Sequence, residues 1–257
     1  MLSHRCDLRA VVVIGVSLRT MPITTCGHDT HVGCVRSHNE DAYLVEPTLG
    51  LGVVADGMGG HECGEVASKI VVECVLNEVQ NGTSVAKSLL KAHHAVLDAA
   101  ERGLGRCGMG STALAIKMDG PQFEVVWVGD SRAYHWGGGR LTQITRDHSL
   151  VQQLVDRGEI SLEQARTHPQ RNYITQAIGM LSLEHLEVGR VQGRLSPGQQ
   201  VLLCSDGLSG EVSDEEIAHV LAQDLSEQEK VDLLIHKALV NGGSDNITVL
   251  LVSAPGS

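Results

Sequence analysis

Apolar residues recur every three or four positions in two long stretches of the first half of the chain. The first covers residues 62–79 and the second runs from about residue 83 to 102. This period places the apolar side chains on one face of a helix, so each stretch predicts a helix with a buried face. Ser-x-x-Glu capping boxes at Ser213 and Ser226 predict the starts of two later helices.

Short apolar runs rich in β-branched residues predict strands. They cover residues 42–45, 51–55, 111–118, 122–128, 201–204 and 247–252. The helices lie between groups of strands, and nothing in their order indicates a parallel βαβ arrangement. Residues 147–179 interrupt the strands with two short helical pieces, and a Ser-x-x-Gln capping box at Ser161 opens the second.

Acidic residues flank these runs at five places. The places are Glu40 with Asp41, then Asp56, Asp130, Asp206 and Asp245. One aspartate at a strand end is usually a turn former, but five such places suggest convergence on one cleft. Two unpaired carboxylates about 4 Å apart repel by roughly 1 kcal/mol in water and about 4 kcal/mol at an effective dielectric constant near 20. The pattern therefore predicts a cluster around metal cations.

The stretch after Asp56 suggests how a cation is approached. Three glycines follow within four positions, which lets backbone atoms come close to a ligand. Asp56 and the carbonyl of Gly57 can then offer two hard oxygens to one ion. The candidate ligands are oxygens with no convergent Cys or His, which favours Mg²⁺ or Mn²⁺. On this stretch alone, a tight turn with a solvated aspartate is an equally good interpretation.

Seven short motifs in this order resemble those of one enzyme family. They are Arg36-x-x-Asn39-Glu40-Asp41, Asp56-Gly-Met-Gly-Gly60, Gly110-Ser-Thr112, Gly129-Asp130-Ser-Arg132, Asp147-His-Ser149, Ser205-Asp206-Gly207 and Asp245-Asn246. Together they resemble the bacterial form of the metal-dependent Ser/Thr protein phosphatases of type 2C. The resemblance runs from about Asp29 to Val252.

The resemblance implies an α+β fold, which is a four-layer sandwich of two antiparallel β-sheets face to face with helices outside. The periodicity allows this architecture but would not have found it alone. We expect a single phosphatase domain over residues 25–254, with an uncertain N-terminal extension at 1–24. The polar, Pro-interrupted segment at about 147–180 corresponds to a flap beside the active cleft.

The resemblance also implies roles for the acidic residues. Asp56 would bridge two Mn²⁺ or Mg²⁺ ions, with Asp206 and Asp245 completing one site and the Gly57 carbonyl the other. The further expected ligands are Glu40 and Asp41, directly or through water, and Asp130, which with Asp206 would hold a third ion. A water bridging the two cations would attack the phosphorus of phosphoserine or phosphothreonine directly, without a phosphoenzyme.

Arg36 is the best candidate for binding the substrate phosphate, because a guanidinium group holds two phosphate oxygens in a fixed fork. The alternative for Arg36 is a surface ion pair with Glu40 or Asp41. Asn246 is expected to orient a metal ligand.

Other classes of protein fit the sequence less well. The glycines after Asp56 do not continue into a nucleotide-binding fingerprint, and neither a Gly-Lys-Ser/Thr nor a Gly-x-Ser-x-Gly sequence occurs. The main alternative is a catalytically silent phosphoprotein-binding regulatory module on the same fold. Such a module would typically have lost one or more ligands.

Composition narrows the partners and the compartment. A formal net charge of −11 argues against nucleic acid as a partner. Seven cysteines without a Cys-x-x-Cys spacing fit a reducing cytoplasm better than a disulfide framework or a zinc site. We expect a monomer, with phosphoproteins as substrates and, by resemblance only, a eukaryotic-like Ser/Thr kinase as its counterpart.

The start of the chain resembles a weak signal peptide, because Arg5 and Arg9 precede an apolar run at residues 10–18. Arg19 interrupts that run, and no Ala-x-Ala site follows. The run is also far shorter than the roughly 20 residues that span a bilayer. We therefore expect neither export nor a membrane anchor.

Overall fold

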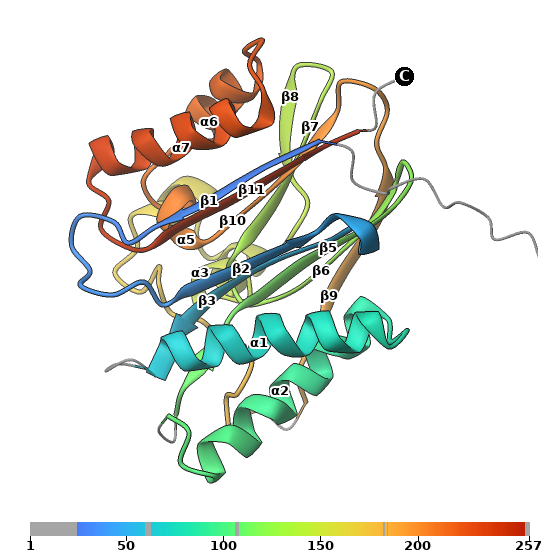
Figure 1. The fold of residues 1–257 in the computed structure, drawn as a ribbon. Helices are drawn as coiled ribbons and strands as arrows, with labels where there is room; N and C mark the ends of the chain where they lie inside the picture. The colour runs from blue at the N-terminus through green and yellow to red at the C-terminus, as the bar shows by residue number, and fades with distance from the viewer. Residues whose placement is uncertain (1–24, 60–62, 106–107, 182, 184, 255–257) are drawn as a thin grey trace, which may run out of the picture.

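The computed structural model describes residues 25–59, 63–105, 108–181, 183 and 185–254. The expected extension at 1–24 lies outside these residues. Two antiparallel sheets lie face to face, and helices cover both outer faces (Figure 1). The expected α+β four-layer sandwich is confirmed.

Each sheet contributes one of the two inner layers. The five-stranded sheet has the order β1 (Cys26–His31), β11 (Ile247–Ser253), β10 (Gln200–Cys204), β7 (Arg132–Gly137) and β8 (Arg140–Gln143). The six-stranded sheet has the order β2 (Asp41–Glu46), β3 (Leu51–Met58), β5 (Ala113–Asp119), β6 (Gln122–Val128) and β9 (Gly189–Arg194), with β4 (Gly110–Ser111) paired to β3. Neighbouring strands are antiparallel in every recorded pair.

Helices form the outer layers and the connections. α1 (Cys63–Gln80) and α2 (Val85–Glu101) cover the six-stranded sheet, and α6 (Asp214–Leu221) and α7 (Glu227–Asn241) cover the five-stranded sheet (Figure 1). The shorter helices are η1 (Pro47–Leu49), α3 (Leu150–Asp156), α4 (Leu162–Arg166) and α5 (Asp206–Ser209). The three predicted capping boxes, at Ser161, Ser213 and Ser226, are all formed.

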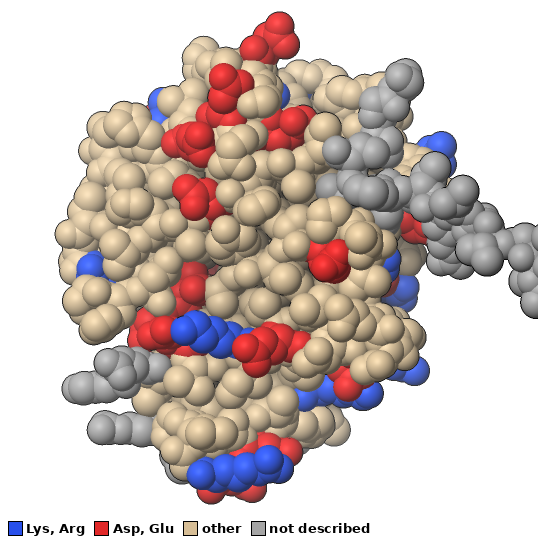
Figure 2. All heavy atoms as spheres, in the orientation of Figure 1, with Lys and Arg blue, Asp and Glu red and all other residues tan. Residues whose placement is uncertain are grey.

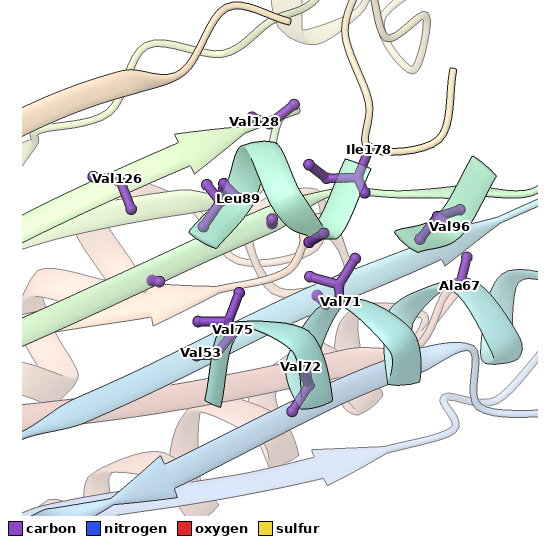
Figure 3. Close-up of a cluster of buried hydrophobic side chains, with 14 of the residues drawn as sticks. Val53, Ala67, Val71, Val72, Val75, Leu89, Val96, Val126, Val128 and Ile178 are labelled. Atoms are coloured by element: carbon purple, nitrogen blue, oxygen red, sulfur yellow. The ribbon is translucent and has the colours of Figure 1, made fainter. Parts of the chain in front are cut away.

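Three hydrophobic clusters fill the spaces between the four layers. Side chains alternate along β3: Val53 packs toward α1 and α2, whereas Val54 packs between the sheets. Figure 3 shows the outer cluster, which lies between the six-stranded sheet and the helices α1 and α2. In it, Val71 and Val75 of α1 and Leu89 of α2 lie against this sheet. Because the strand is buried on both faces, it reads as an uninterrupted apolar run.

Two strand boundaries differ from the predicted ones. β3 does not stop at Asp56 but continues to Met58, because Gly57 and Met58 pair with Ser111 and Gly110 of β4. The predicted strand at 111–118 is likewise divided between β4 and β5 at Thr112. Pairing with a short strand from elsewhere in the chain is a tertiary contact that the local pattern does not contain.

The surface agrees with the acidic composition. Acidic and basic side chains alternate over α1 on the face shown in Figure 2, and the described residues form no continuous basic patch there. None of the described helices is both long and apolar enough to cross a bilayer.

The packing of α2 yields a prediction with an internal control. Leu89 is fully buried, whereas its neighbour Leu90 is 42% exposed. Leu89→Ala should lower the free energy of unfolding by about 2–5 kcal/mol, because it leaves a cavity in the outer cluster. Leu90→Ala should change it by less than about 0.5 kcal/mol. Urea unfolding followed by circular dichroism measures both, and equal effects would contradict the described packing of α2.

Candidate metal centre

The antiparallel topology directs the five acidic places to one end of the sandwich. Asp41 begins β2 and lies opposite Asp56 in the β2–β3 ladder. Asp130 follows β6, Asp206 follows β10 as the first residue of α5, and Asp245 precedes β11. In an antiparallel pair the start of one strand lies beside the end of its neighbour, so these residues gather at the same edge.

Asp56 and Asp206 come from different sheets, yet their carboxyl groups are close enough for the charge of Asp206 to raise the pKa of Asp56. Two ionised carboxylates in such a position repel each other, so the pair favours a proton or a cation beside it. Asp56 is also held through its backbone, since its N–H donates to Thr112 Oγ1 at 2.9 Å and its carbonyl accepts from Ser111 Oγ at 3.0 Å. The carboxyl group is thus brought to its neighbours by a fixed main chain.

The electrostatics of this end are unfavourable for negative charge. Burial raises the pKa of Asp56 well above its ordinary value, and the charges of Asp41, Asp206, Asp130 and Asp245 raise it further. The pKa values of Asp41, Asp130 and Asp206 are raised in the same direction, again chiefly by burial. A cation among these groups would offset both causes, because it stabilises the ionised form.

Two buried oxygens support this interpretation. Oδ1 of Asp41 and Oδ1 of Asp206 have no hydrogen-bond partner. An unpaired buried acceptor costs about 1–3 kcal/mol, and both atoms belong to predicted ligands. Among the described residues, however, no group of three or more His, Cys, Asp or Glu side chains already has an arrangement that could hold a metal ion. The residues fit a hard cation in charge and donor type.

Gly57 lies where the start of α1 approaches β3. A Cβ on Gly57 would stand 2.1 Å from the carbonyl oxygen of Gly64 and 2.6 Å from that of Glu40. Only glycine permits this approach. The Gly57 N–H donates to the Glu40 carbonyl at 3.1 Å, and Ser68 Oγ donates to the same oxygen at 2.6 Å. The contacts tie Glu40, β3 and α1 together.

Asn246 binds backbone groups of residues 32–40 through its side chain, and one of these groups belongs to the predicted ligand Glu40. Its Oδ1 accepts from the Glu40 N–H at 2.8 Å, and its Nδ2 donates to the carbonyls of Val32 and His38 at 2.9 Å each. The side chain is buried. Asn246 therefore fastens the loop that carries Arg36 and the predicted ligand Glu40.

Arg36 forms an ion pair, but its partner is neither Glu40 nor Asp41. Its Nη2 lies 2.7 Å from Oδ2 of Asp245, with 52% of the arginine side chain and 32% of the aspartate side chain exposed. Arg36 thus contacts a predicted metal ligand and stays accessible to solvent.

Two motif residues had no role in the sequence analysis. Arg132 and Asp147 form an ion pair in which Nη2 lies 2.7 Å and Nε 3.0 Å from Oδ2 of Asp147. Asp147 is buried and is one of the charges facing Asp130. The motifs contained both residues, but only the fold brings β7 to the start of the 147–180 segment.

Comparisons with known proteins agree with this geometry. The profile of the family described as protein phosphatase 2C matches residues 35–239. The serine/threonine phosphatase stp of Listeria welshimeri is 37% identical over 236 residues, covering 87% of this chain and 93% of the relative. The serine/threonine protein phosphatase PstP of Mycobacterium tuberculosis is 40% identical over 225 residues, covering 85% of this chain and 43% of the relative.

Solved structures are also similar. The crystal structure of the M. tuberculosis phosphatase PstP/Ppp has a TM-score of 0.80 and 37% identity, covering 90% of this chain and 98% of that one. The structure of the PstP catalytic domain in complex with two manganese ions has a TM-score of 0.78 and 34% identity, covering 89% and 96% of the two chains.

The loop anchored by Asn246 gives a test that needs no assay of activity. Asn246→Ala removes the partners of three backbone groups, each of which costs about 1–3 kcal/mol when buried and unpaired. We expect a lower free energy of unfolding and faster hydrogen exchange at the Glu40 amide. Asn81→Ala is the control, because that exposed amide bonds only to the Asn77 carbonyl within its own helix end. Unchanged exchange at Glu40 would contradict the anchoring role.

Proposed function

Because this chain belongs to the protein phosphatase 2C family, we propose that the acidic end of its sandwich is where phosphoserine and phosphothreonine of proteins are hydrolysed. The chain is a metal-dependent protein-serine/threonine phosphatase, and the silent alternative has no support, because every acidic residue of the motifs is present. The observation that supports this location is the contact between the two sheets there: Ser205, next to Asp206, donates to Oδ2 of Asp41, which lies opposite Asp56.

The ligand assignment is part of the proposal. Asp56 would serve both Mn²⁺ or Mg²⁺ ions, Asp206 and Asp245 would complete one site, and the Gly57 carbonyl would belong to the other. Further groups are Glu40 and Asp41, and a third ion at Asp130 with Asp206. The two manganese ions in the related PstP structure and the unpaired Oδ1 atoms of Asp41 and Asp206 support it. When bound, the cations supply an acidified water and positive charge against the phosphoryl oxygens.

Arg36 is proposed to bind the substrate phosphate. Its pair with Asp245 is partly exposed, and pairs open to solvent contribute only about 0–1 kcal/mol. Exchanging this carboxylate for two phosphate oxygens therefore costs little, and the guanidinium fork matches the phosphate geometry. The exchange also releases Asp245 to serve as a ligand.

The segment 147–180 is proposed to be a flap that shapes substrate access. Its far end is tied beside Asp56, since Ile178 and Ser111 exchange backbone hydrogen bonds of 3.0 and 2.8 Å. α4 reaches α6 through Arg166, whose Nη2 lies 3.3 Å from Oδ2 of Asp214. One end of the segment is thus fixed by backbone hydrogen bonds, whereas its contact with α6 is an exposed ion pair.

The cellular setting is also proposed. We infer a single phosphatase domain over residues 25–254, a monomer, a place in signal transduction in the cytoplasm, and a eukaryotic-like Ser/Thr kinase that phosphorylates the same proteins. Support comes from relatives named as serine/threonine phosphatases and from the absence of a described helix that could span a bilayer.

Metal removal tests the centre. The protein should hydrolyse phosphothreonine peptides with Mn²⁺ or Mg²⁺ and lose this activity in EDTA, and Mn²⁺ at about 100 times its Kd should stabilise the fold by about 2.7 kcal/mol. Asp56→Asn should lower kcat by about two orders of magnitude or more, because it removes the shared negative ligand. Asp119→Asn, at an exposed position away from the centre, is the control. Full activity after exhaustive chelation would refute the two-cation proposal.

Arg36→Ala tests the phosphate site. Losing a hydrogen bond to a charged group costs about 1.5–3 kcal/mol, so KM for a phosphopeptide should rise about tenfold or more. Arg36→Lys should recover only part of this loss, because an ammonium group lacks the fork. Arg140→Ala, at an exposed position on β8, should behave like the wild type. Steady-state kinetics at saturating Mn²⁺ decides the matter, and an unchanged KM would assign Arg36 to the ion pair alone.

A further inference from the structure

A closed ring of hydrogen bonds joins the five-stranded sheet to Asp41. Thr30 of β1 lies opposite Thr248 of β11, and their Oγ1 atoms are 2.8 Å apart. Thr248 Oγ1 donates to Oδ2 of Asp41 at 2.6 Å, and Asn39 Nδ2 donates to Thr30 Oγ1 at 2.9 Å. The Asp41 N–H closes the ring by donating to Oδ1 of Asn39 at 3.1 Å.

The chemistry of these groups gives the ring one direction. A hydroxyl group carries one hydrogen, and an ionised carboxylate is only an acceptor. Since Thr248 gives its hydrogen to Asp41, the hydrogen between the two threonines belongs to Thr30. The Asn39 amide then donates to Thr30. Its orientation is consistent at both ends, because its oxygen faces the Asp41 N–H.

The ring leaves the two oxygens of Asp41 in different states. Oδ2 accepts from Thr248 and also from Ser205 Oγ at 2.9 Å. Ser205 is itself placed by the Thr248 N–H, which donates to its oxygen at 2.9 Å. Oδ1 is buried and has no partner. Two hydroxyl groups from the opposite sheet therefore hold one oxygen of Asp41 and leave the other available.

We propose that Thr30 and Thr248 are positioning residues for the cation at Asp41. Their directed hydrogen bonds fix the carboxylate so that Oδ1, and not Oδ2, is presented to the ion or to its water. The same ring holds Asn39, at the end of the loop that carries Arg36, so it sets the metal and phosphate sides of the centre together. This inference rests on the proposed function, because it assumes that Asp41 serves a cation.

The ring of hydrogen bonds can be broken by a substitution that keeps the shape of the threonine side chain. Thr248→Val keeps the branched side chain and removes the hydroxyl group, whereas Thr248→Ser keeps the hydroxyl group and removes the methyl group. Thr30→Val breaks the ring one bond further from Asp41. Thr142→Val on β8 is the matched control, since Thr142 is exposed and has no recorded side-chain hydrogen bond.

The primary measurement is Mn²⁺ binding to metal-free protein by isothermal titration calorimetry, without substrate. Loss of a hydrogen bond that orients a metal ligand typically costs 10–100-fold in affinity. We therefore expect Thr248→Val to weaken the affected Mn²⁺ site about tenfold or more, Thr30→Val to weaken it less, and Thr248→Ser and Thr142→Val to match the wild type.

The outcomes separate this inference from the proposed function. Wild-type Mn²⁺ affinity in Thr248→Val would overturn it, as would equal losses in Thr248→Ser and Thr248→Val, which would indicate packing rather than a directed hydroxyl group. If Thr248→Val fails to fold, Thr30→Val decides in its place, and unchanged affinity there overturns the inference. A wild-type protein without Mn²⁺-dependent hydrolysis would instead refute the proposed function.

Discussion

The structure depends on holding several acidic side chains close together in a buried region at one end of the sandwich. An isolated buried carboxylate is costly, and a group of them is tolerated only with protons or cations between them. A proton on one of the clustered carboxyl groups is the first solution, and burial and mutual repulsion favour it by raising the pKa values of Asp41, Asp56, Asp130 and Asp206. The unpaired oxygens of Asp41 and Asp206 point to the second solution, because a hard cation satisfies such atoms.

The stability needed to hold this arrangement comes from elsewhere in the molecule. Three apolar clusters fix the four layers, and strands such as β3 are buried on both faces. Polar groups then make the final adjustment at the acidic end, where Asn246 and Thr248 link the five-stranded sheet to the loop 32–40 and to Asp41. Hydrophobic burial is non-directional, so it sets the distance between the sheets, whereas the hydrogen bonds set the orientation of side chains such as that of Asp41.

The Arg36–Asp245 pair places the candidate for phosphate binding beside a candidate metal ligand. Nη2 of Arg36 lies 2.7 Å from Oδ2 of Asp245, which is partly exposed. A cation near Asp245 and a phosphate near Arg36 would each offer that group a stronger partner. The exposed, weak pair keeps both residues near their proposed partners without binding them tightly to one another.

Sequence alone predicted the four long helices, six apolar strand segments, the capping boxes and the identity of the acidic residues, because each depends on local spacing. The less apolar strands β1, β7, β8 and β9 were not among these predictions. The sequence suggested that Asp41, Asp56 and Asp206 converge, because each lies at a strand end. It did not show which of the two sheets each residue belongs to. The extension of β3 to Met58, the Arg132–Asp147 pair and the role of Asn246 depended on partners distant in the chain. Hydroxyl groups such as those of Thr30 and Thr248 carry no local signal, since a strand threonine looks the same whether it faces solvent or a carboxylate. Only the register of two sheets decided that difference.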